Sequence, residues 1–131
     1  MPIITADELG SDFAQRAVPE GIHALRINNT RFGTSDAGNR GLTLFIKIEE
    51  MSEYDPPDVV AWLGEPTPHT SEYKRYMRQV QAFLKAIDWK GDFDMERDAP
   101  ELIGKTFRFA LTQEKDRRDK SQTVNRLALP R

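Results

Sequence analysis

An eight-residue run of alternating apolar and polar side chains, residues 42–49, constrains the fold of this chain most strongly. The apolar side consists of Leu42, Leu44, Ile46 and Ile48, and the other side of Thr43, Phe45, Lys47 and Glu49. A period of two is that of a β-strand with one buried face. The face that meets water then carries an aromatic ring and a cation next to each other, which calls for an explanation beyond packing.

A second strand precedes this run. In residues 22–28 the side chains of His23, Leu25 and Ile27 fall on one side, and Arg26 falls on the other. Residues 35–39 (Ser-Asp-Ala-Gly-Asn) have the composition of a hairpin loop. The sequence therefore predicts that the two strands pair.

Three further strands are predicted at residues 58–63, 105–113 and 122–129. In the second of these, Phe107, Phe109 and Leu111 point inward and Arg108 outward. One main helix is predicted at residues 71–87, because its apolar side chains recur every three or four positions. They are Tyr73, Tyr76, Met77, Val80, Phe83, Leu84 and Ile87. A short helix is predicted at residues 5–17, and residues 88–100 are predicted to be an acidic loop.

The order strand, strand, strand, helix, strand, strand predicts a mainly β protein with one main helix. It is the order of a five-stranded Greek-key barrel whose helix lies between strands 3 and 4. An α+β sandwich is the alternative. A chain of 131 residues is enough for one domain. We expect a single domain over residues 1–131, with residues 1–18 as an N-terminal extension.

The chain has no cysteine, which excludes disulfides and thiol catalysis and is typical of a reducing compartment. It has no apolar stretch near the ~20 residues of a membrane span. We expect a cytoplasmic protein without membrane contact.

The net charge of -2 is unevenly distributed. Residues 22–48 carry four basic side chains against one acidic, and residues 105–131 carry eight against three. The remainder of the chain is strongly acidic. Such asymmetry indicates a surface that binds a polyanion.

No enzyme motif is complete. Residues 103–106 (Ile-Gly-Lys-Thr) resemble the end of a phosphate-binding loop, but Ala99 stands where that motif has its first glycine. The acidic run Asp92, Asp94, Glu96 and Asp98 lacks the glycine and the final glutamate of a calcium loop. His23 and His69 have no partner at catalytic or metal-binding spacing. We expect no enzyme activity, cofactor or metal.

Four places in the chain resemble a family of bacteriophage proteins with an OB-fold that bind single-stranded DNA. They are Pro19–Gly21 before the strand ending at Ile27; Ser35–Asn39; Gln81–Ile87; and Leu102–Lys105 before a strand, with Asn125 closing the pattern. The resemblance covers most of residues 19–129. It implies an OB-like nucleic-acid-binding domain that acts in phage-type replication or recombination in the host cytoplasm, with replication or recombination proteins as possible partners.

Proteins that hold single strands combine aromatic faces for bases with cations for phosphates. Phe45 and Lys47 supply one of each, Trp62 offers a second ring, and a basic tip joins the last two strands. The predicted nucleic-acid-binding residues are Arg26, Phe45, Lys47, Trp62, Arg108, Lys115, Arg117, Arg118 and Lys120.

Two other functions fit the sequence. The protein could be an interaction or assembly module with an OB-like or α+β fold, in which Phe45 packs against another segment. A weaker alternative is a magnesium-dependent nuclease that uses Asp92, Asp94 and Glu96.

Overall fold

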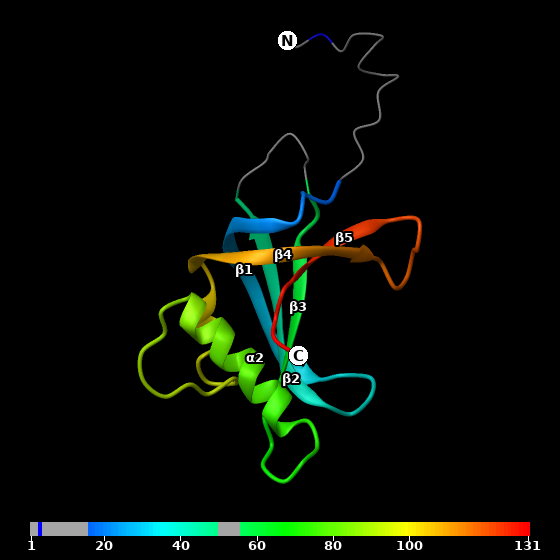
Figure 1. Cartoon of the computed structure of the whole chain (residues 1–131). Coiled ribbons are helices and arrows are strands. Elements are labelled where there is room, and N and C mark those ends of the chain that lie inside the picture. The colour runs from blue at the N-terminus through cyan, green and yellow to red at the C-terminus, as the bar shows by residue number, and fades with distance from the viewer. Residues whose placement is uncertain (1–2, 4–15, 50–55) are drawn as a thin grey trace.

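The computed structural model describes residues 3, 16–49 and 56–131, and Figure 1 shows their arrangement. The strands are β1 (Gly21–Thr34), β2 (Arg40–Ile48), β3 (Val59–Gly64), β4 (Thr106–Lys115) and β5 (Thr123–Leu127). The helices in these residues are α2 (Tyr73–Ala86) and the short α3 (Ala99–Leu102). All five strands form one antiparallel sheet in the order β3-β2-β1-β4-β5. The prediction of a mainly β protein is confirmed.

The sheet is strongly curled because β1 is long and shared between two neighbours. Residues 21–26 of β1 pair with β4, and residues 25–34 pair with β2. The register with β2 shifts between Ile27 and Asn29, which leaves Asn28 as an extra residue. A bulge of this kind bends a strand and increases its twist. The curl brings the edge strands β3 and β5 into contact, so the sheet forms a half-barrel.

The same bulge explains why β1 is longer than the predicted strand 22–28. Residues 28–31 are all polar, which interrupts the apolar alternation. The extra residue restores the register, so that Thr30 lies opposite Leu44 and Phe32 opposite Leu42. The strand therefore continues to Thr34.

Other boundaries differ less. The helix predicted at 71–87 is observed at Tyr73–Ala86. The last strand ends at Leu127 instead of residue 129, because the Leu129 N–H bonds locally to the Leu127 carbonyl. The expected loop 88–100 runs into α3, which is too short to show a helical period in sequence. Of the helix predicted at 5–17, residues 5–15 lie outside the described residues, and Arg16 and Ala17 are not helical.

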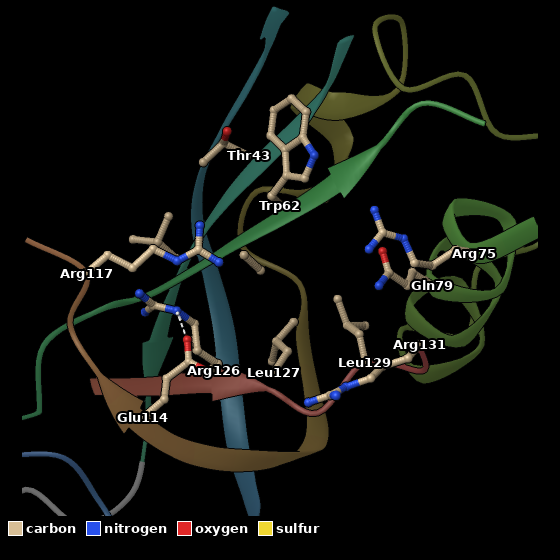
Figure 2. A pocket seen from close by; sticks show the side chains of 12 residues that line it. Thr43, Trp62, Arg75, Gln79, Glu114, Arg117, Arg126, Leu127, Leu129 and Arg131 are labelled. Atoms are coloured by element: carbon tan, nitrogen blue, oxygen red, sulfur yellow. Dashed lines mark ion pairs between the residues drawn. The ribbon is translucent and has the colours of Figure 1, made fainter. Parts of the chain in front are cut away.

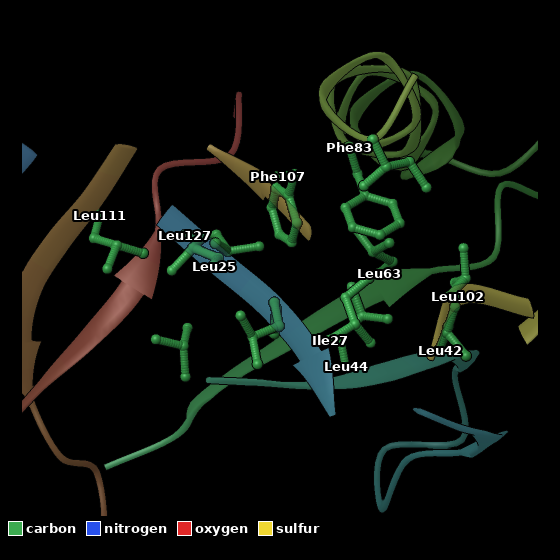
Figure 3. Close-up of a cluster of buried hydrophobic side chains, with 14 of the residues drawn as sticks. Leu25, Ile27, Leu42, Leu44, Leu63, Phe83, Leu102, Phe107, Leu111 and Leu127 are labelled. Atoms are coloured by element: carbon green, nitrogen blue, oxygen red, sulfur yellow. The ribbon is translucent and has the colours of Figure 1, made fainter. Parts of the chain in front are cut away.

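The core lies on the concave side of the sheet and beneath α2. The side chains of Leu25, Ile27, Leu44 and Leu63 are fully buried, and Phe83 projects from α2 among them (Figure 3). The rings of Phe83 and Phe107 meet edge to face, with centroids 5.9 Å apart. In the part of the chain that the structure describes, no helix is long and apolar enough to cross a membrane.

A buried amide attaches the segment before β1 to the far edge of the sheet. Asn125 on β5 is only 2% exposed. Its Oδ1 accepts a hydrogen bond from the Val18 N–H at 2.9 Å, and its Nδ2 donates to the carbonyls of Val18 and Thr112 at 3.0 and 3.1 Å. The side chain thereby replaces a strand partner for Val18, which is itself fully buried.

Replacing Asn125 with Ala should lower the free energy of unfolding by about 1 to 3 kcal/mol, because it leaves the buried Val18 N–H without an acceptor. Urea denaturation followed by circular dichroism measures this. The exposed Gln122→Ala change is the control, and it should stay within about 0.5 kcal/mol of the parent protein. Equal effects of the two changes would contradict the role given to Asn125.

Candidate nucleic-acid interface

A groove of about 660 Å³ lies over the seam between the sheet edges β3 and β5. We call it the basic groove. Its floor includes Ala61 and Leu127, where the edges meet without being neighbours in the sheet. Its other lining residues come from β2, β3, α2, β4, β5 and the segments after β4 and β5 (Figure 2). They are Thr43, Val60, Trp62, Arg75, Gln79, Glu114, Arg117, Arg126, Leu129 and Arg131.

Trp62 is directed outward because it alternates with the buried Ala61 and Leu63. Its partner across the ladder is Thr43. The indole ring reaches over β2 at Gly41, where an added Cβ would lie 2.5 Å from the ring and 2.5 Å from the Leu63 carbonyl oxygen. The absence of a side chain at Gly41 thus leaves room for the ring. The structure presents a half-buried aromatic ring at the edge of the groove.

Four arginines and one glutamate line the basic groove, so its side chains carry a positive surplus. Arg126 is held by Glu114, with Nε and Oε1 3.0 Å apart, as drawn in Figure 2. Arg75 is paired with Glu72 one helical turn away. Within the described residues, no carboxylate pairs with Arg117 or Arg131. These two guanidinium groups are therefore the ones most available to an anionic ligand.

The segment that carries Arg117 is shaped by its own acidic side chains. Asp116 Oδ1 accepts a hydrogen bond from the Arg118 N–H at 2.9 Å. Asp119 Oδ1 accepts bonds from the Ser121 hydroxyl and N–H, and these bonds lower the pKa of Asp119. The acids close the turn, and the basic side chains are left to project from it. Arg117 projects into the groove (Figure 2).

The structure places Trp62 and Arg117 of the predicted residues together in the basic groove. Phe45 and Lys47 lie on the same outward face of β2 as Thr43, beyond the groove lining, and Phe45 is half-buried opposite Val60. Arg26 lies opposite Lys47 and forms a 2.9 Å ion pair with Glu49.

The other predicted residues lie outside the groove lining. Arg108 lies on the outward face of β4, beside α2 and Ile22. Lys115 donates from Nζ to the Thr123 hydroxyl at 3.2 Å. Arg118 and Lys120 are exposed in the connection between β4 and β5.

Sequence reasoning missed several residues of the groove. Arg126 could have been found, because it is outward by the same alternation that identified Arg108. Arg75 and Gln79 share one side of α2, but no pattern in the sequence shows that this side meets β3 and β5. Arg131 depends on the path of the chain after β5, which is likewise a tertiary feature.

Of the acidic residues proposed for a nuclease, Asp94 binds the backbone and Glu96 forms an ion pair with Arg40 at 3.8 Å. Asp94 Oδ1 accepts hydrogen bonds from the N–H groups of Glu96 and Arg97. The buried Asp98 accepts from the Arg97 guanidinium and from the Asp94 N–H. Among residues 16–49 and 56–131, no group of three or more His, Asp or Glu side chains is placed to hold a metal ion.

These bonds, first from the Arg97 side chain and then from the Asp94 N–H, hold the pKa of Asp98 below its ordinary value. A carboxyl with a lowered pKa stabilises the fold above its ordinary pKa. That contribution is lost as the pH falls through the lowered value. The network around Asp98 is thus complete at neutral pH.

The chain matches no protein-family model, and no curated protein matches it either. The geometry of the basic groove is therefore the basis for a functional interpretation.

Replacing Gly41 with Ala should displace the Trp62 ring, because the new Cβ meets both the ring and a backbone carbonyl. Acrylamide quenching in a Trp89→Phe background, where Trp62 is the remaining tryptophan, measures its accessibility. Gly33→Ala is the matched control: Gly33 pairs with Gly41, and nothing lies within 4 Å of its added Cβ. We expect altered quenching for Gly41→Ala alone. Identical quenching in both variants would show that Gly41 does not position the ring.

Proposed function

We propose that this protein binds single-stranded DNA in the basic groove, without reading its sequence and without catalysis. The observation that supports this most is the meeting of Trp62 and Arg117, from distant parts of the chain, in one groove lined by four arginines. Binding of this kind uses an aromatic face for a base and cations for the phosphates on either side of it.

The proposal includes an OB-like Greek-key barrel with α2 between the third and fourth strands. OB-folds bind nucleic acid on the face of strands 2 and 3, between the loops that join strands 1 to 2 and 4 to 5. Here Thr43 lies on β2, Trp62 on β3 and Arg117 in the β4–β5 connection. With the resemblance to phage single-strand binders, this supports a role in phage-type replication or recombination in the host cytoplasm.

A single strand suits this groove better than a duplex. In a duplex each base already stacks on its neighbours, so its face is not available to an indole ring. A single strand and a duplex can both make the phosphate contacts. The contribution of Trp62 to binding should therefore distinguish a single strand from a duplex.

Fluorescence anisotropy with a labelled oligothymidine and a duplex of equal length, over a series of salt concentrations, tests the proposal. We expect tighter binding of the single strand. Trp62→Ala should weaken it by about 1 to 3 kcal/mol, or about 5- to 150-fold, and leave duplex binding nearly unchanged. Comparable affinity of the parent protein for both forms would refute the proposal and favour an interaction module.

The adjacent arginines of the β4–β5 connection provide a matched pair. Arg117 lines the groove and Arg118 does not. Because each phosphate contact on a single strand contributes about 0.7 to the log-log salt slope, Arg117→Gln should make the slope shallower by about that amount. Arg118→Gln should leave it unchanged. A reversed or equal pattern in the same titrations would mean that the strand follows another path.

Glu114 should oppose binding, because its carboxylate repels phosphate and occupies Arg126. Glu114→Gln should tighten single-strand binding at low salt by about 1 kcal/mol, or about fivefold, and steepen the salt slope by about 0.7. Glu101→Gln, an equal charge change at an exposed position outside the groove lining, is the control. If both variants gain equally, net charge is responsible and not the groove.

A further inference from the structure

An apolar groove of about 390 Å³ lies on another side of the molecule, between α2 and the segment that follows it. Its apolar walls include Met77 and Leu84 of α2, together with Phe93 and Met95. Its charged lining residues are Glu65 and Asp94, and no basic side chain lines it. Arg40, outside the lining, is 3.8 Å from both Glu65 and Glu96, so acidic side chains remain in excess there. We call it the acidic-rimmed groove. Its charge disfavours DNA, and its methionines provide an adaptable apolar surface.

This groove is held in shape by contacts outside it. Phe93 meets the ring of Trp89 edge to face at 5.3 Å. Trp89 donates from its indole N–H to the Asp92 carbonyl at 3.0 Å, and the Lys105 ammonium lies over its ring. The Asp98 network fixes the next turn of backbone. The groove does not need a ligand to form.

A second exposed apolar surface has the opposite charge. Ile22 is 64% exposed and lies opposite Ala110 on the outward face of the sheet. With Phe109 and Ala86 it lines a shallow depression of about 420 Å³ whose charged lining residues are Lys85 and Arg108. No acidic side chain lines this surface, which we call the basic apolar patch. A large apolar side chain this exposed within an apolar depression is a candidate point of contact with a partner.

We propose that the basic apolar patch of one copy of this chain docks on the acidic-rimmed groove of another. Both surfaces are apolar at the centre and have opposite charges, so each provides what the other lacks. A contact between two different surfaces of the same chain is head-to-tail. After each copy is added, one groove and one patch remain unoccupied at the two ends of the assembly. The contact therefore builds linear arrays instead of closed dimers.

The geometry of α2 allows both contacts at once. Met77, Gln81 and Leu84 form one stripe of the helix and line the groove, whereas Ala82, Lys85 and Ala86 form another and line the patch. No residue lines both surfaces, and neither shares a residue with the basic groove. A copy in an array keeps its basic groove open.

Sedimentation equilibrium at low salt, from about 10 µM to 1 mM protein and without DNA, tests the contact directly. We expect the average mass to rise above the 15.0 kDa of one chain and to continue past two chains. Lys85→Glu should remove this increase. Lys74→Glu, the same charge change at an exposed position of α2 outside both linings, should retain it. A mass of one chain at every concentration overturns the proposal. The acidic-rimmed groove would then be a binding site for a segment of another protein.

A mixing experiment tests the head-to-tail geometry. Met77→Lys alters only the groove and Lys85→Glu only the patch, so each variant alone should stay at one chain. Their mixture should reach two chains and stop, because one intact groove meets one intact patch. Circular dichroism checks folding, and Gln81→Lys, at an exposed groove position, replaces Met77→Lys if that variant unfolds. A mixture that remains at one chain, with either groove variant, overturns the proposal.

The contact should also make binding to DNA cooperative, and this part rests on the proposed function. Neighbours on one strand have an effective concentration near millimolar, so a weak contact becomes populated. We expect each copy on a long oligothymidine to bind about tenfold more tightly than a single copy on a short one. Lys85→Glu should lose this gain but keep the affinity for the short strand. Failure of all DNA binding would leave the sedimentation result unaffected, so the two proposals can fail separately.

Discussion

The bulge at Asn28 determines the shape on which the rest of the structure depends. It follows residues 25–26, which pair with both β4 and β2, and it bends β1 between the start that pairs with β4 and the end that pairs with β2. The two ladders therefore curl around a common core. The curl brings β3 close to β5, and the basic groove lies over the seam between them. A straight β1 would keep these edges apart and separate Trp62 from Arg126.

The sequence predicted the parts of the fold that depend on local periodicity. The alternation in β2 and β4 and the stripe of α2 assign both the elements and their buried faces correctly, down to Phe83 and Phe107. The extent of β1 was predicted wrongly because the bulge shifts the alternation by one residue. The bulge lies in a run of polar residues, which has the composition of a loop. Nothing local marks the role of Asn125, since its partner Val18 lies 107 residues earlier.

The candidate site was predictable to a smaller degree. Alternation identifies Trp62 as outward, and local charge identifies Arg117. Their convergence depends on the curl of the sheet, and so does the separation of Arg108 from them. The pairing of Arg26 with Glu49 likewise requires the ends of β1 and β2 to be adjacent. Residue type and outward direction can be inferred from sequence, whereas the grouping of outward residues follows from tertiary structure.

The two aromatic rings on the outward face of β2 and β3 are not equivalent. Phe45 projects beyond the groove lining, and the charged neighbours on its face are Arg26 and Lys47, the first of them already paired. Trp62 borders a groove with two arginines that have no carboxylate partner among the described residues, and Gly41 makes room for its ring. A base that stacks on Trp62 has cations within the same groove for the adjoining phosphates, which a base on Phe45 does not. In the proposed mode of binding, the first base therefore stacks on Trp62, and Phe45 with Lys47 continue the path of the DNA across β2.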